Sequence, residues 1–354
     1  MAINKIKVLI IDDSALVRHI LKSGLANDPE IEVVGMANDP FEASERIVEL
    51  RPDVLTLDVE MPKMDGIEFL KQLLPQYPIP VIMISSSTER GSRITMQALE
   101  VGAVDFLTKS RTDIQGSLNS LITQLRAKIK MAAKVDVRKM MNSLFSAEAR
   151  VQEVTGLDLD KVIAIGVSTG GFETMRYILK SLPRTMPGMV VTQHMPPGYT
   201  KTYAERLSDC TQLNVVEAKD GDQIFPGKVL VAPGGLQMEV EGKGTYTVRC
   251  YEGEKVNGHC PSVDVLFNSM AKRVGRKGIG LILTGMGDDG ADGMLAMKNA
   301  GAHTIAQDEE SSVVFGMPKM AIERGATKEI VSLKKIPDKL IATLVASGNK
   351  SGKY

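Results

Sequence analysis

Short apolar runs alternate with amphipathic stretches over the first 125 or so residues, and this alternation constrains the fold more than any other feature. The apolar runs cover residues 7–11, 32–36, 54–57, 80–85 and 104–108. The amphipathic stretches cover residues 14–26, 40–50, 64–77 and 92–101, and a last one begins near residue 113. Strands that are apolar on both faces are typical of a parallel sheet covered by helices. This part of the chain is therefore predicted to be a βαβ series.

A second series of the same kind begins at residue 161. Its apolar runs cover residues 161–167, 189–193, 214–218, 228–233, 278–285 and 303–307. Between residues 236 and 251, apolar and polar residues alternate on either side of Gly242–Gly244, which predicts an antiparallel hairpin. We expect the second part to be a doubly wound, mostly parallel α/β sheet that also carries this hairpin.

The chain of 354 residues is long for one hydrophobic core, so two domains are expected. We place the first domain at residues 1–125, an interdomain linker at 126–159 and the second domain at 160–348. The linker is polar and lacks a strong apolar period. Two interpretations of it stay open, a partly helical connection and a flexible tether.

Composition limits the classes of partner. The 43 Lys and Arg residues balance 43 Asp and Glu residues, which argues against a sequence-wide attraction to nucleic acid or to an anionic membrane. No apolar run is long enough for membrane insertion, and we expect no signal peptide. The three cysteines lack metal-ligand spacing and are interpreted as reduced thiols of a cytoplasmic protein.

Four of the predicted strands in the first series end in polar residues. Asp12 and Asp13 follow the first strand, Asp58 the third, Ser85 the fourth and Lys109 the fifth. These ends line one edge of a parallel sheet, where ligands bind. Clustered carboxylates favour a hard cation such as Mg²⁺, and a lysine can neutralise a phosphoryl group. Asp58 would then be a nucleophile that forms an aspartyl phosphate. The alternative is that these residues only cap the helices that follow.

Residues 5–125 resemble a response-regulator receiver domain. The resemblance rests on the motifs IIDDS, LDVEMPKMDG, PVIMISS and GAVDFLTK. It implies a flavodoxin-like fold with five parallel strands in the order 2-1-3-4-5. It also implies phosphorylation at Asp58. The Mg²⁺ ligands that it implies are Asp12 or Asp13, Asp58 and the backbone carbonyl of Val59.

The same resemblance implies a switch in the receiver. Its residues would be Ser85, Phe106 and Lys109. Receivers usually follow this lysine with proline, whereas this chain has Ser110. A cis peptide before a residue other than proline costs about 3 kcal/mol, so the isomer of this bond is left open. We still expect Lys109 to reach the phosphoryl group.

The second series contains a G-x-S-x-G pattern at Gly166–Gly170, with Ser168 at its centre. Glycines between a strand and a helix permit a tight turn that exposes the serine hydroxyl, as in a nucleophile elbow. The N-terminus of the following helix would present N–H groups to developing negative charge. The alternative is a glycine-rich turn that holds a phosphate. However, the turn lacks G-x-G-x-x-G, and the next strand ends in His194 rather than in an acid.

A nucleophilic serine needs a base and an acid that orients it. His194 lies at a strand end, whereas His19 lies in a predicted receiver helix and His303 opens a strand. His259 lies in a loop and stays open as an alternative base. A lone histidine is often structural, which is the alternative for His194.

Asp288 and Asp289 follow the strand in GIGLILTGMGDDG and are candidates for the acid. The alternative is that one of them caps the next helix. The resulting chain order is serine, histidine, acid, whereas α/β-hydrolases have serine, acid, histidine. This order argues against that family.

Residues 160–346 resemble the catalytic domain of the chemotaxis protein-glutamate methylesterases, the CheB family. The motifs are AIGVSTGG, TQHMP, VLVAPG, CPSVDVLFNSMA, LTGMGDDG and VVFGMPKMA. The resemblance implies a nucleophile, a base and an acid, which are Ser168, His194 and Asp289, with Asp288 as second choice. It implies oxyanion donors in the backbone N–H groups near Thr169 and Met286.

What the resemblance implies about function is specific. The enzyme would hydrolyse glutamyl methyl esters on methyl-accepting chemoreceptors and deamidate certain glutamines, with a chemotaxis histidine kinase as phosphodonor and Mg²⁺ needed only for phosphorylation. Gly235 and Gln237 replace an acid and a histidine of the family, so a substrate contact by that loop is in doubt. The rival hypothesis is a receiver fused to a binding module without catalysis. DNA binding is disfavoured, because no helix-turn-helix with a basic face is present.

Overall fold

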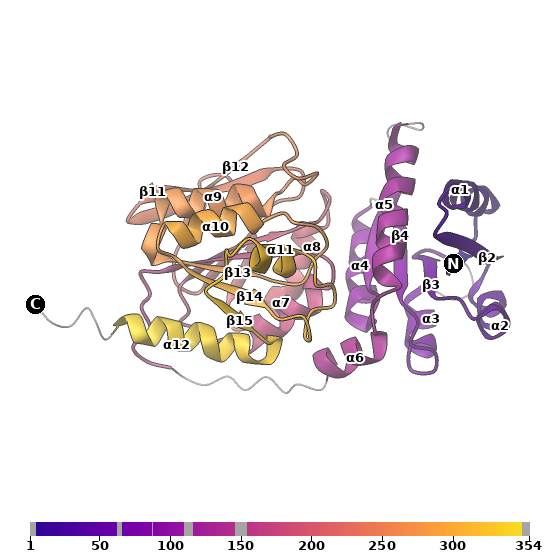
Figure 1. The fold of residues 1–354 in the computed structure, drawn as a ribbon, viewed down its shortest axis with the longest axis horizontal. Coiled ribbons are helices and arrows are strands. Elements are labelled where there is room, and N and C mark those ends of the chain that lie inside the picture. The colour runs from indigo at the N-terminus through magenta and orange to yellow at the C-terminus, as the bar shows by residue number, and fades with distance from the viewer. Residues whose placement is uncertain (1–4, 62–65, 87, 110–115, 146–153, 349–354) are drawn as a thin grey trace, which may run out of the picture. The chain divides into compact units, whose positions relative to one another are not determined.

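The computed structural model describes residues 5–61, 66–86, 88–109, 116–145 and 154–348. The chain forms two compact units, Met1–Asn142 and Ser143–Tyr354 (Figure 1). Two units agree with the prediction of two domains. The limits 1–125, 126–159 and 160–348 stay predictions.

The first unit is built on a five-stranded sheet in the order β2-β1-β3-β4-β5, with every neighbouring pair parallel. The strands are β1 (Ile6–Ile11), β2 (Ile31–Ala37), β3 (Val54–Asp58), β4 (Val81–Ser86) and β5 (Asp105–Lys109). The helices are α1 (Ala15–Ala26), α2 (Pro40–Leu50), α3 (Gly66–Leu73), α4 (Glu89–Val101) and α5 (Gly116–Ala132). This topology confirms the expected receiver-like α/β fold.

Helix starts in this unit follow their capping residues. The Asp39 carboxylate accepts hydrogen bonds from the first turn of α2, and Pro40 occupies the first helical position. Helix α4 begins at Glu89, three residues before the predicted start at residue 92, because the Thr88 hydroxyl accepts a hydrogen bond from the Gly91 N–H. The prediction placed the start of α4 too late because the first turn of this helix is polar and does not show in the apolar period.

Two helices adjoin the predicted linker. Helix α5 runs to Ala132, and its predicted start near residue 113 lies outside the described residues. A further helix, α6 (Val137–Phe145), lies within the segment 126–159. The linker is therefore partly helical, and its residues 146–153 lie outside the described part.

The second unit contains a seven-stranded parallel sheet in the order β15-β14-β13-β6-β7-β10-β8. Its strands are β6 (Val162–Val167), β7 (Gly188–Gln193), β8 (Asn214–Glu217), β10 (Lys228–Val231), β13 (Gly278–Ile282), β14 (His303–Gln307) and β15 (Glu329–Val331). The predicted hairpin is present as β11 (Gln237–Lys243) and β12 (Thr245–Tyr251), which pair antiparallel, and β9 (Gln223–Ile224) adds to it. The mostly parallel sheet with an antiparallel excursion is confirmed.

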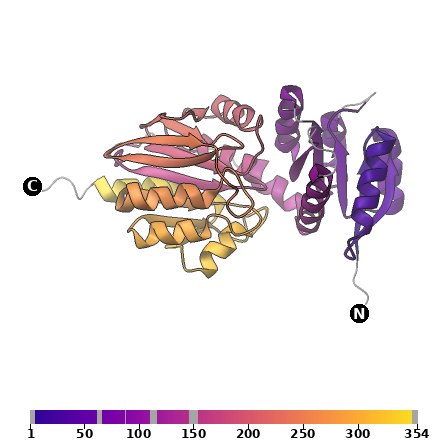
Figure 2. The same ribbon diagram turned by 90° about the horizontal axis from the view of Figure 1, so that it is seen from above.

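Two groups of helices pack on the large sheet (Figure 1). One group consists of α9 (Val263–Arg273), α10 (Ala291–Asn299) and α11 (Met317–Glu323). The other consists of α7 (Gly171–Lys180), α8 (Thr200–Asp209) and α12 (Ile336–Gly348). The hairpin packs against α9 through β11 (Figure 2). Phe267 of α9 is fully buried in the core of this unit, and burial of such a side chain contributes about 1.5–3 kcal/mol.

Two short strands and one strand end were not predicted. Strands β9 and β15 are two and three residues long, too short to show a period. The predicted strand at residues 278–285 stops at Ile282. Beyond it, the Leu283 N–H still donates to the Gly166 carbonyl at 2.9 Å, and the Thr284 hydroxyl accepts from the Val314 N–H at 2.9 Å. The loop that follows carries the candidate acid.

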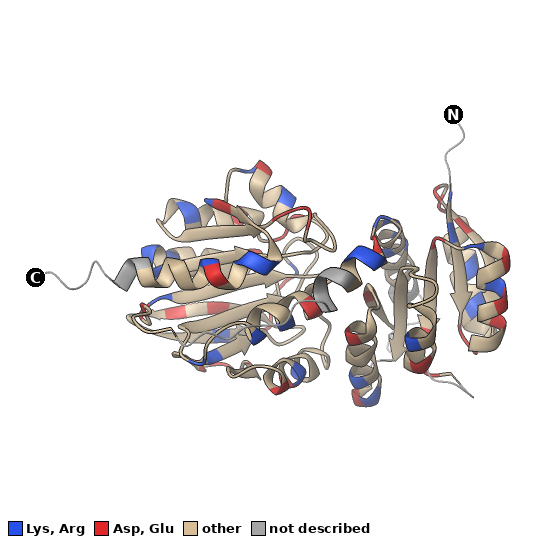
Figure 3. Ribbon diagram, turned by 90° about the horizontal axis from the view of Figure 1, so that it is seen from below, with Lys and Arg blue, Asp and Glu red and all other residues tan. Residues whose placement is uncertain are grey.

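Charged residues of both signs are interspersed over both units on the face drawn in Figure 3. Within the described residues, no helix is both long and apolar enough to cross a membrane. Cys210, Cys250 and Cys260 are all free thiols.

Candidate active site and phosphorylation site

Ser168 lies in a tight turn between β6 and α7. Gly170 has φ 75°, a left-handed conformation that favours glycine, and an added Cβ there would lie 2.5 Å from Val313. The Ser168 N–H donates to the carbonyl of Thr284 at 3.0 Å, and the Ser168 carbonyl accepts from the Gly171 N–H at 2.9 Å. Ser168 is half-buried and comes directly after β6, at the end of the sheet.

His194 follows the neighbouring strand. Val167 and Gln193 are register partners of β6 and β7, and the His194 N–H donates to the Val167 carbonyl at 3.2 Å. Ser168 and His194 each come one residue after that pair. Since adjacent strands lie about 4.8 Å apart, the two residues are neighbours at the carboxyl edge of the sheet.

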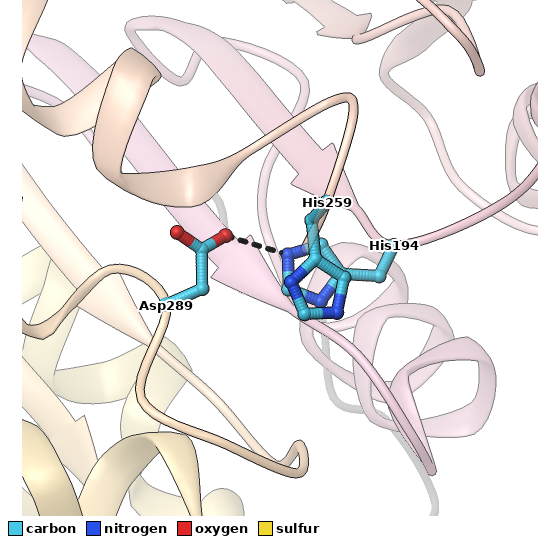
Figure 4. A group of neighbouring side chains, drawn as sticks. All are labelled: His194, His259 and Asp289. Carbon is cyan, nitrogen blue, oxygen red and sulfur yellow. Dashed lines mark hydrogen bonds and ion pairs between the residues drawn. The ribbon is translucent and has the colours of Figure 1, made fainter. Parts of the chain in front are cut away.

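Asp289 lies beside the His194 ring, at its Nε2 edge (Figure 4). His194 Nε2 and Asp289 Oδ2 are 2.8 Å apart, and Asp289 is fully buried. His194 Nδ1 is buried and has no hydrogen-bond partner among the described residues. An ionised Asp289 accepts, so Nε2 carries the proton and Nδ1 holds the lone pair. The structure therefore leaves Nδ1 as the basic atom of this ring.

The Asp289 carboxylate also lies at the N-terminus of α9. It accepts hydrogen bonds from the Ser262 hydroxyl at 2.7 Å and from the backbone N–H groups of Val263 at 2.7 Å and Asp264 at 3.2 Å. Burial raises the pKa of Asp289, but the bond and charge of His194 and these donors outweigh it and lower the pKa to about 2. The carboxylate is thus held ionised without access to water.

The other candidate acid points elsewhere. Asp288 is half-exposed and pairs with Arg324 at 3.1 Å. The structure brings Asp289 to His194 and leaves Asp288 in a surface ion pair. The alternative was that Asp289 only caps α10, the helix that follows it in the sequence. The groups that donate hydrogen bonds to its carboxylate belong instead to His194 and to the start of α9.

The segment that would supply one oxyanion donor is fixed beside the serine. Gly285 donates to the carbonyl of Val314 at 3.0 Å and accepts from the N–H of Met317 at 2.9 Å. A Cβ on Gly285 would lie 2.7 Å from the Ser168 Cβ, so this loop touches the nucleophile. Met286 follows, and its N–H makes no hydrogen bond to any other part of the described chain.

The second expected oxyanion residue, Thr169, is buried in the elbow. Its carbonyl accepts a hydrogen bond from the Thr284 hydroxyl at 2.9 Å. This bond ties the elbow to the loop that carries Met286.

Of the other histidines, His259 is part of the site. Its ring stacks on that of His194, with centroids 3.7 Å apart and planes at 8° (Figure 4). His19 is exposed on α1, and His303 pairs with Glu329 at 2.8 Å. The sequence left His259 open because a loop residue has no period that places it.

In the first unit, Lys109 bridges two carboxylates. Its ammonium group lies 2.9 Å from Asp12 and 2.8 Å from Asp58. Burial, with the nearby Asp12 charge, raises the pKa of Asp58 to about 6 despite the lysine. Burial lowers the pKa of Lys109, but the two carboxylates outweigh it and the net direction is upward. The two shifts have different causes, because burial disfavours the charge of Asp58, whereas the two carboxylates favour the charge of Lys109.

The acidic cluster fits a hard cation. Asp12, Asp13 and Asp58 can each direct a carboxylate oxygen to a common point, with these atoms within 4.8 Å of one another. Oxygen-only donors suit Mg²⁺. Val59, whose carbonyl was expected to add a ligand, is buried next to Asp58.

The expected switch residues are buried around this cluster. The Ser85 hydroxyl donates to the Gly91 carbonyl at 3.2 Å, at the start of α4. Phe106 is 7% exposed, with its side chain packed into the unit. Ser110 lies outside the described residues, so the isomer of its peptide bond stays open.

Comparison with known proteins identifies the family of each unit. Residues 163–340 match the family model described as CheB methylesterase, and residues 8–119 match the response regulator receiver domain. A protein-glutamate methylesterase/protein-glutamine glutaminase of Syntrophotalea carbinolica is 53% identical over 345 residues, which cover 96% of this chain and 98% of the relative. The chain belongs to the CheB methylesterase family. It is a hydrolase of that family joined to a response-regulator receiver.

Two further relatives of this CheB-family chain are informative. The protein-glutamate methylesterase/protein-glutamine glutaminase of Escherichia coli K12 is 45% identical over 344 residues, which cover 97% of this chain and 98% of the relative. The crystal structure of the Thermotoga maritima CheB methylesterase catalytic domain aligns with a TM-score of 0.51 at 40% identity. It covers 52% of this chain and 98% of the solved chain, which supports the fold of the second unit.

Proposed function

We propose that this chain hydrolyses methyl esters of glutamyl side chains in proteins through Ser168, His194 and Asp289. The observation that carries the proposal is the buried His194–Asp289 pair, at 2.8 Å, next to a serine in a nucleophile elbow. The names of the curated relatives support glutamate methyl ester as the substrate class and glutamine as a second one.

The geometry supports a two-step acyl transfer. His194 Nδ1 removes the proton of the Ser168 hydroxyl, whose oxygen attacks the ester carbonyl. The N–H groups of Thr169 and Met286 stabilise the oxyanion, a contribution of about 2.7–4 kcal/mol for each such donor. The imidazolium then protonates the methoxide, and methanol leaves. Water, deprotonated by His194, cleaves the acyl-enzyme to a glutamate and restores the serine.

The same site can deamidate glutamine. An amide carbonyl offers the same point of attack, and the imidazolium then protonates the leaving nitrogen to give ammonia. The acyl-enzyme and its hydrolysis are common to both reactions. The product is a glutamate in either case, as the double name of the relatives requires.

The substrates we propose are methyl-accepting chemoreceptors, in line with the chemotaxis family to which the chain belongs. A cytoplasmic location is proposed with them, supported by the three free thiols. We propose no nucleic-acid partner and no membrane insertion, in agreement with the balanced net charge.

The receiver would be phosphorylated on Asp58 by a chemotaxis histidine kinase. The Asp58 oxygen attacks the phosphoryl group of the kinase phosphohistidine, so the N–P bond breaks as the O–P bond forms. Mg²⁺ would be held by Asp12 or Asp13, Asp58 and the Val59 carbonyl, and when bound it neutralises phosphoryl charge. Lys109, already at the cluster, would move its bond from the carboxylates to the phosphoryl oxygens.

Control of the esterase would begin with that new charge. Ser85 would turn its hydroxyl from the Gly91 carbonyl to the phosphoryl group, and Phe106 would repack beside it. The receiver (1–125), the linker (126–159) and the catalytic domain (160–348) are the proposed parts of this device. We propose that phosphorylation raises the rate of ester hydrolysis.

Replacement of the nucleophile tests the enzymatic proposal. Ser168→Ala should lose methanol release from methylated receptor membranes and should no longer react with a fluorophosphonate probe. Ser208→Ala, on the half-exposed surface of α8, is the matched control and should retain both. Full methanol release by Ser168→Ala would overturn the proposal, and an unlabelled but folded wild type would favour a binding module.

A further inference from the structure

The segment 254–262, which joins the hairpin to α9, contains a tight turn at its centre. We name it the clamp loop. Val256 and His259 exchange backbone hydrogen bonds of 3.0 and 2.9 Å, and Asn257 and Gly258 between them have φ 51° and 80°. These are the features of a two-residue turn in which an Asn-Gly pair accepts left-handed conformations. The turn therefore has one defined shape, although Val256, Asn257 and Gly258 are exposed.

The first side chain of this turn reaches the catalytic acid. Asn257 Nδ2 donates to Asp289 Oδ1 at 3.1 Å and to Asp264 Oδ2 at 2.7 Å. One amide thus lies between two buried carboxylates that repel each other. Burial and the Asp289 charge contribute to raising the pKa of Asp264, as expected for such neighbours. The amide fixes the separation of the two acids and the orientation of the Asp289 carboxylate.

The last residue of the turn reaches the catalytic base. The His259 ring lies on the face of His194, at 3.7 Å between centroids and 8° between planes (Figure 4). A parallel ring leaves the edge nitrogens of His194 open and blocks rotation of its plane. The stacked ring therefore keeps Nε2 on Asp289 and leaves Nδ1, which has no hydrogen-bond partner among the described residues, as the open nitrogen. The face of an aromatic ring also favours a nearby cation, such as the imidazolium formed during the reaction.

Gln237 of β11 anchors the loop to the hairpin. Its Nε2 donates to the carbonyls of Glu254 at 2.8 Å and His259 at 3.3 Å, and its Oε1 accepts from the Ser262 N–H at 2.8 Å. The side chain is 2% exposed. A buried amide that bonds both ends of a loop fixes its path, because leaving any of these groups unpaired costs about 1–3 kcal/mol. This is the position where the family usually has a histidine.

We propose that the clamp loop is a positioning element for the catalytic pair, in which Asn257 orients Asp289 and His259 orients His194. Gln237 holds the loop in place from the hairpin. The inference rests on the proposed function, since it assigns a role relative to the proposed base and acid. Asn257 and His259 act through these residues and are positioning residues.

Asn257→Gly tests the contact to the acid. Glycine keeps the left-handed turn but deletes the amide, so the variant should fold. We expect kcat for methanol release to fall on the order of tenfold, by analogy with metal sites, where removing a hydrogen-bond partner of a ligand costs about 10–100-fold. KM should stay unchanged, and the downfield proton resonance of His194 Nε2–H should shift. Lys255→Ala, an exposed change in the same loop, is the control and should leave all three unchanged.

His259→Ala and His259→Phe test the contact to the base. Alanine removes the stacked ring, and kcat should fall roughly 10–100-fold with KM unchanged. Phenylalanine restores a flat ring without ring nitrogens and should return kcat to within about threefold of the wild type if stacking is the role. A histidine that served as proton donor would not be rescued in this way.

The outcomes separate the two levels of inference. If Ser168→Ala is inactive while Asn257→Gly and His259→Ala keep wild-type kcat, the clamp proposal is overturned and the proposed function stands. A loss of kcat in His259→Phe equal to that in His259→Ala also overturns stacking as the role. If Ser168→Ala is active, the proposed function itself fails. Thermal unfolding of each full-length variant shows that it is folded.

Discussion

At the scale of single residues, the orientation of His194 decides which of its atoms can act as the base. The acid bonds Nε2, and Nδ1 is the buried atom without a partner within the described chain. In chymotrypsin-type proteases the acid holds Nδ1 instead and Nε2 meets the serine. The roles of acid, base and nucleophile are the same in both cases, because only the geometry of the three groups matters.

Asp289→Asn should lose most of the activity. An amide at this place no longer fixes the proton on Nε2 or balances the imidazolium charge, and a loss of kcat on the order of 10⁴-fold is expected from the equivalent change in a serine protease. Asp288→Asn is the matched control, since it changes only a surface ion pair worth at most about 1 kcal/mol. Methanol release measures both variants. Equal losses in the two would contradict the assignment of the acid.

Asp58 is a residue whose charge destabilises its own domain. Its pKa of about 6 lies above the usual value near 4, so the folded state keeps the proton while the unfolded state loses it. Stability therefore falls as pH rises from about 4 to about 6 and is constant above that. Asp58→Asn should raise the free energy of unfolding of the first unit by about 1–3 kcal/mol at pH 7 and by little below pH 4. Chemical denaturation across this pH range tests the sign, and a destabilised variant at pH 7 would refute it.

At the scale of elements, the site depends on close packing around the turn between β6 and α7 and around the loop that follows β13. Val313 packs against Gly170 in the elbow, and Met317 packs against Gly285 in the loop beside Ser168. Neither glycine has room for a side chain. The nucleophile and the oxyanion loop are therefore held by packing between segments far apart in the sequence.

Gly170→Ala should damage both stability and activity. The new methyl group would lie 2.5 Å from Val313 in a left-handed backbone, and overpacking of this kind costs about 1–3 kcal/mol. Gly325→Ala is the matched control, because Gly325 has φ 65° with no atom within 4 Å of an added Cβ. Gly325→Ala should lose stability only through backbone strain and should keep the wild-type kcat. Thermal unfolding and methanol release compare the two, and equal effects would show that packing at the elbow is unimportant.

At the scale of the whole molecule, the proposed phosphorylation site and the proposed esterase site lie in separate compact units. Ester hydrolysis as proposed uses no group from the receiver, and phosphorylation uses none from the catalytic unit. An effect of phosphorylation on ester hydrolysis therefore requires both units in one full-length chain.

Metal removal should separate the two chemistries. With a small-molecule phosphodonor and Mg²⁺, methanol release by the full-length chain should rise, and EDTA should abolish the rise by preventing phosphorylation at Asp58. The basal rate should be insensitive to EDTA. Asp58→Asn should show the basal rate under all conditions. A basal rate that EDTA abolishes would contradict a metal-free esterase.

The sequence was informative where a pattern is local. The alternation of apolar runs predicted the five receiver strands and six of the strands in the second sheet, because burial on both faces leaves a continuous apolar run. It missed β9 and β15, whose few residues have no period. The local pattern left both Asp288 and Asp289 as candidates, because adjacent residues differ only in where the fold turns their side chains, and only the family resemblance put Asp289 first.

The sequence by itself determined the two α/β units, the polar residues at the strand ends and the family resemblance, since these depend on residue type at short spacing. Only the tertiary structure decided which acid meets His194, which ring nitrogen stays open and that Asn257, His259 and Ser262 surround the pair. Those contacts join a loop after an antiparallel hairpin to the edge of a parallel sheet. Asp289 lies 32 positions from Asn257, 27 from Ser262 and 95 from His194 in the sequence, which is beyond the range of any local sequence pattern.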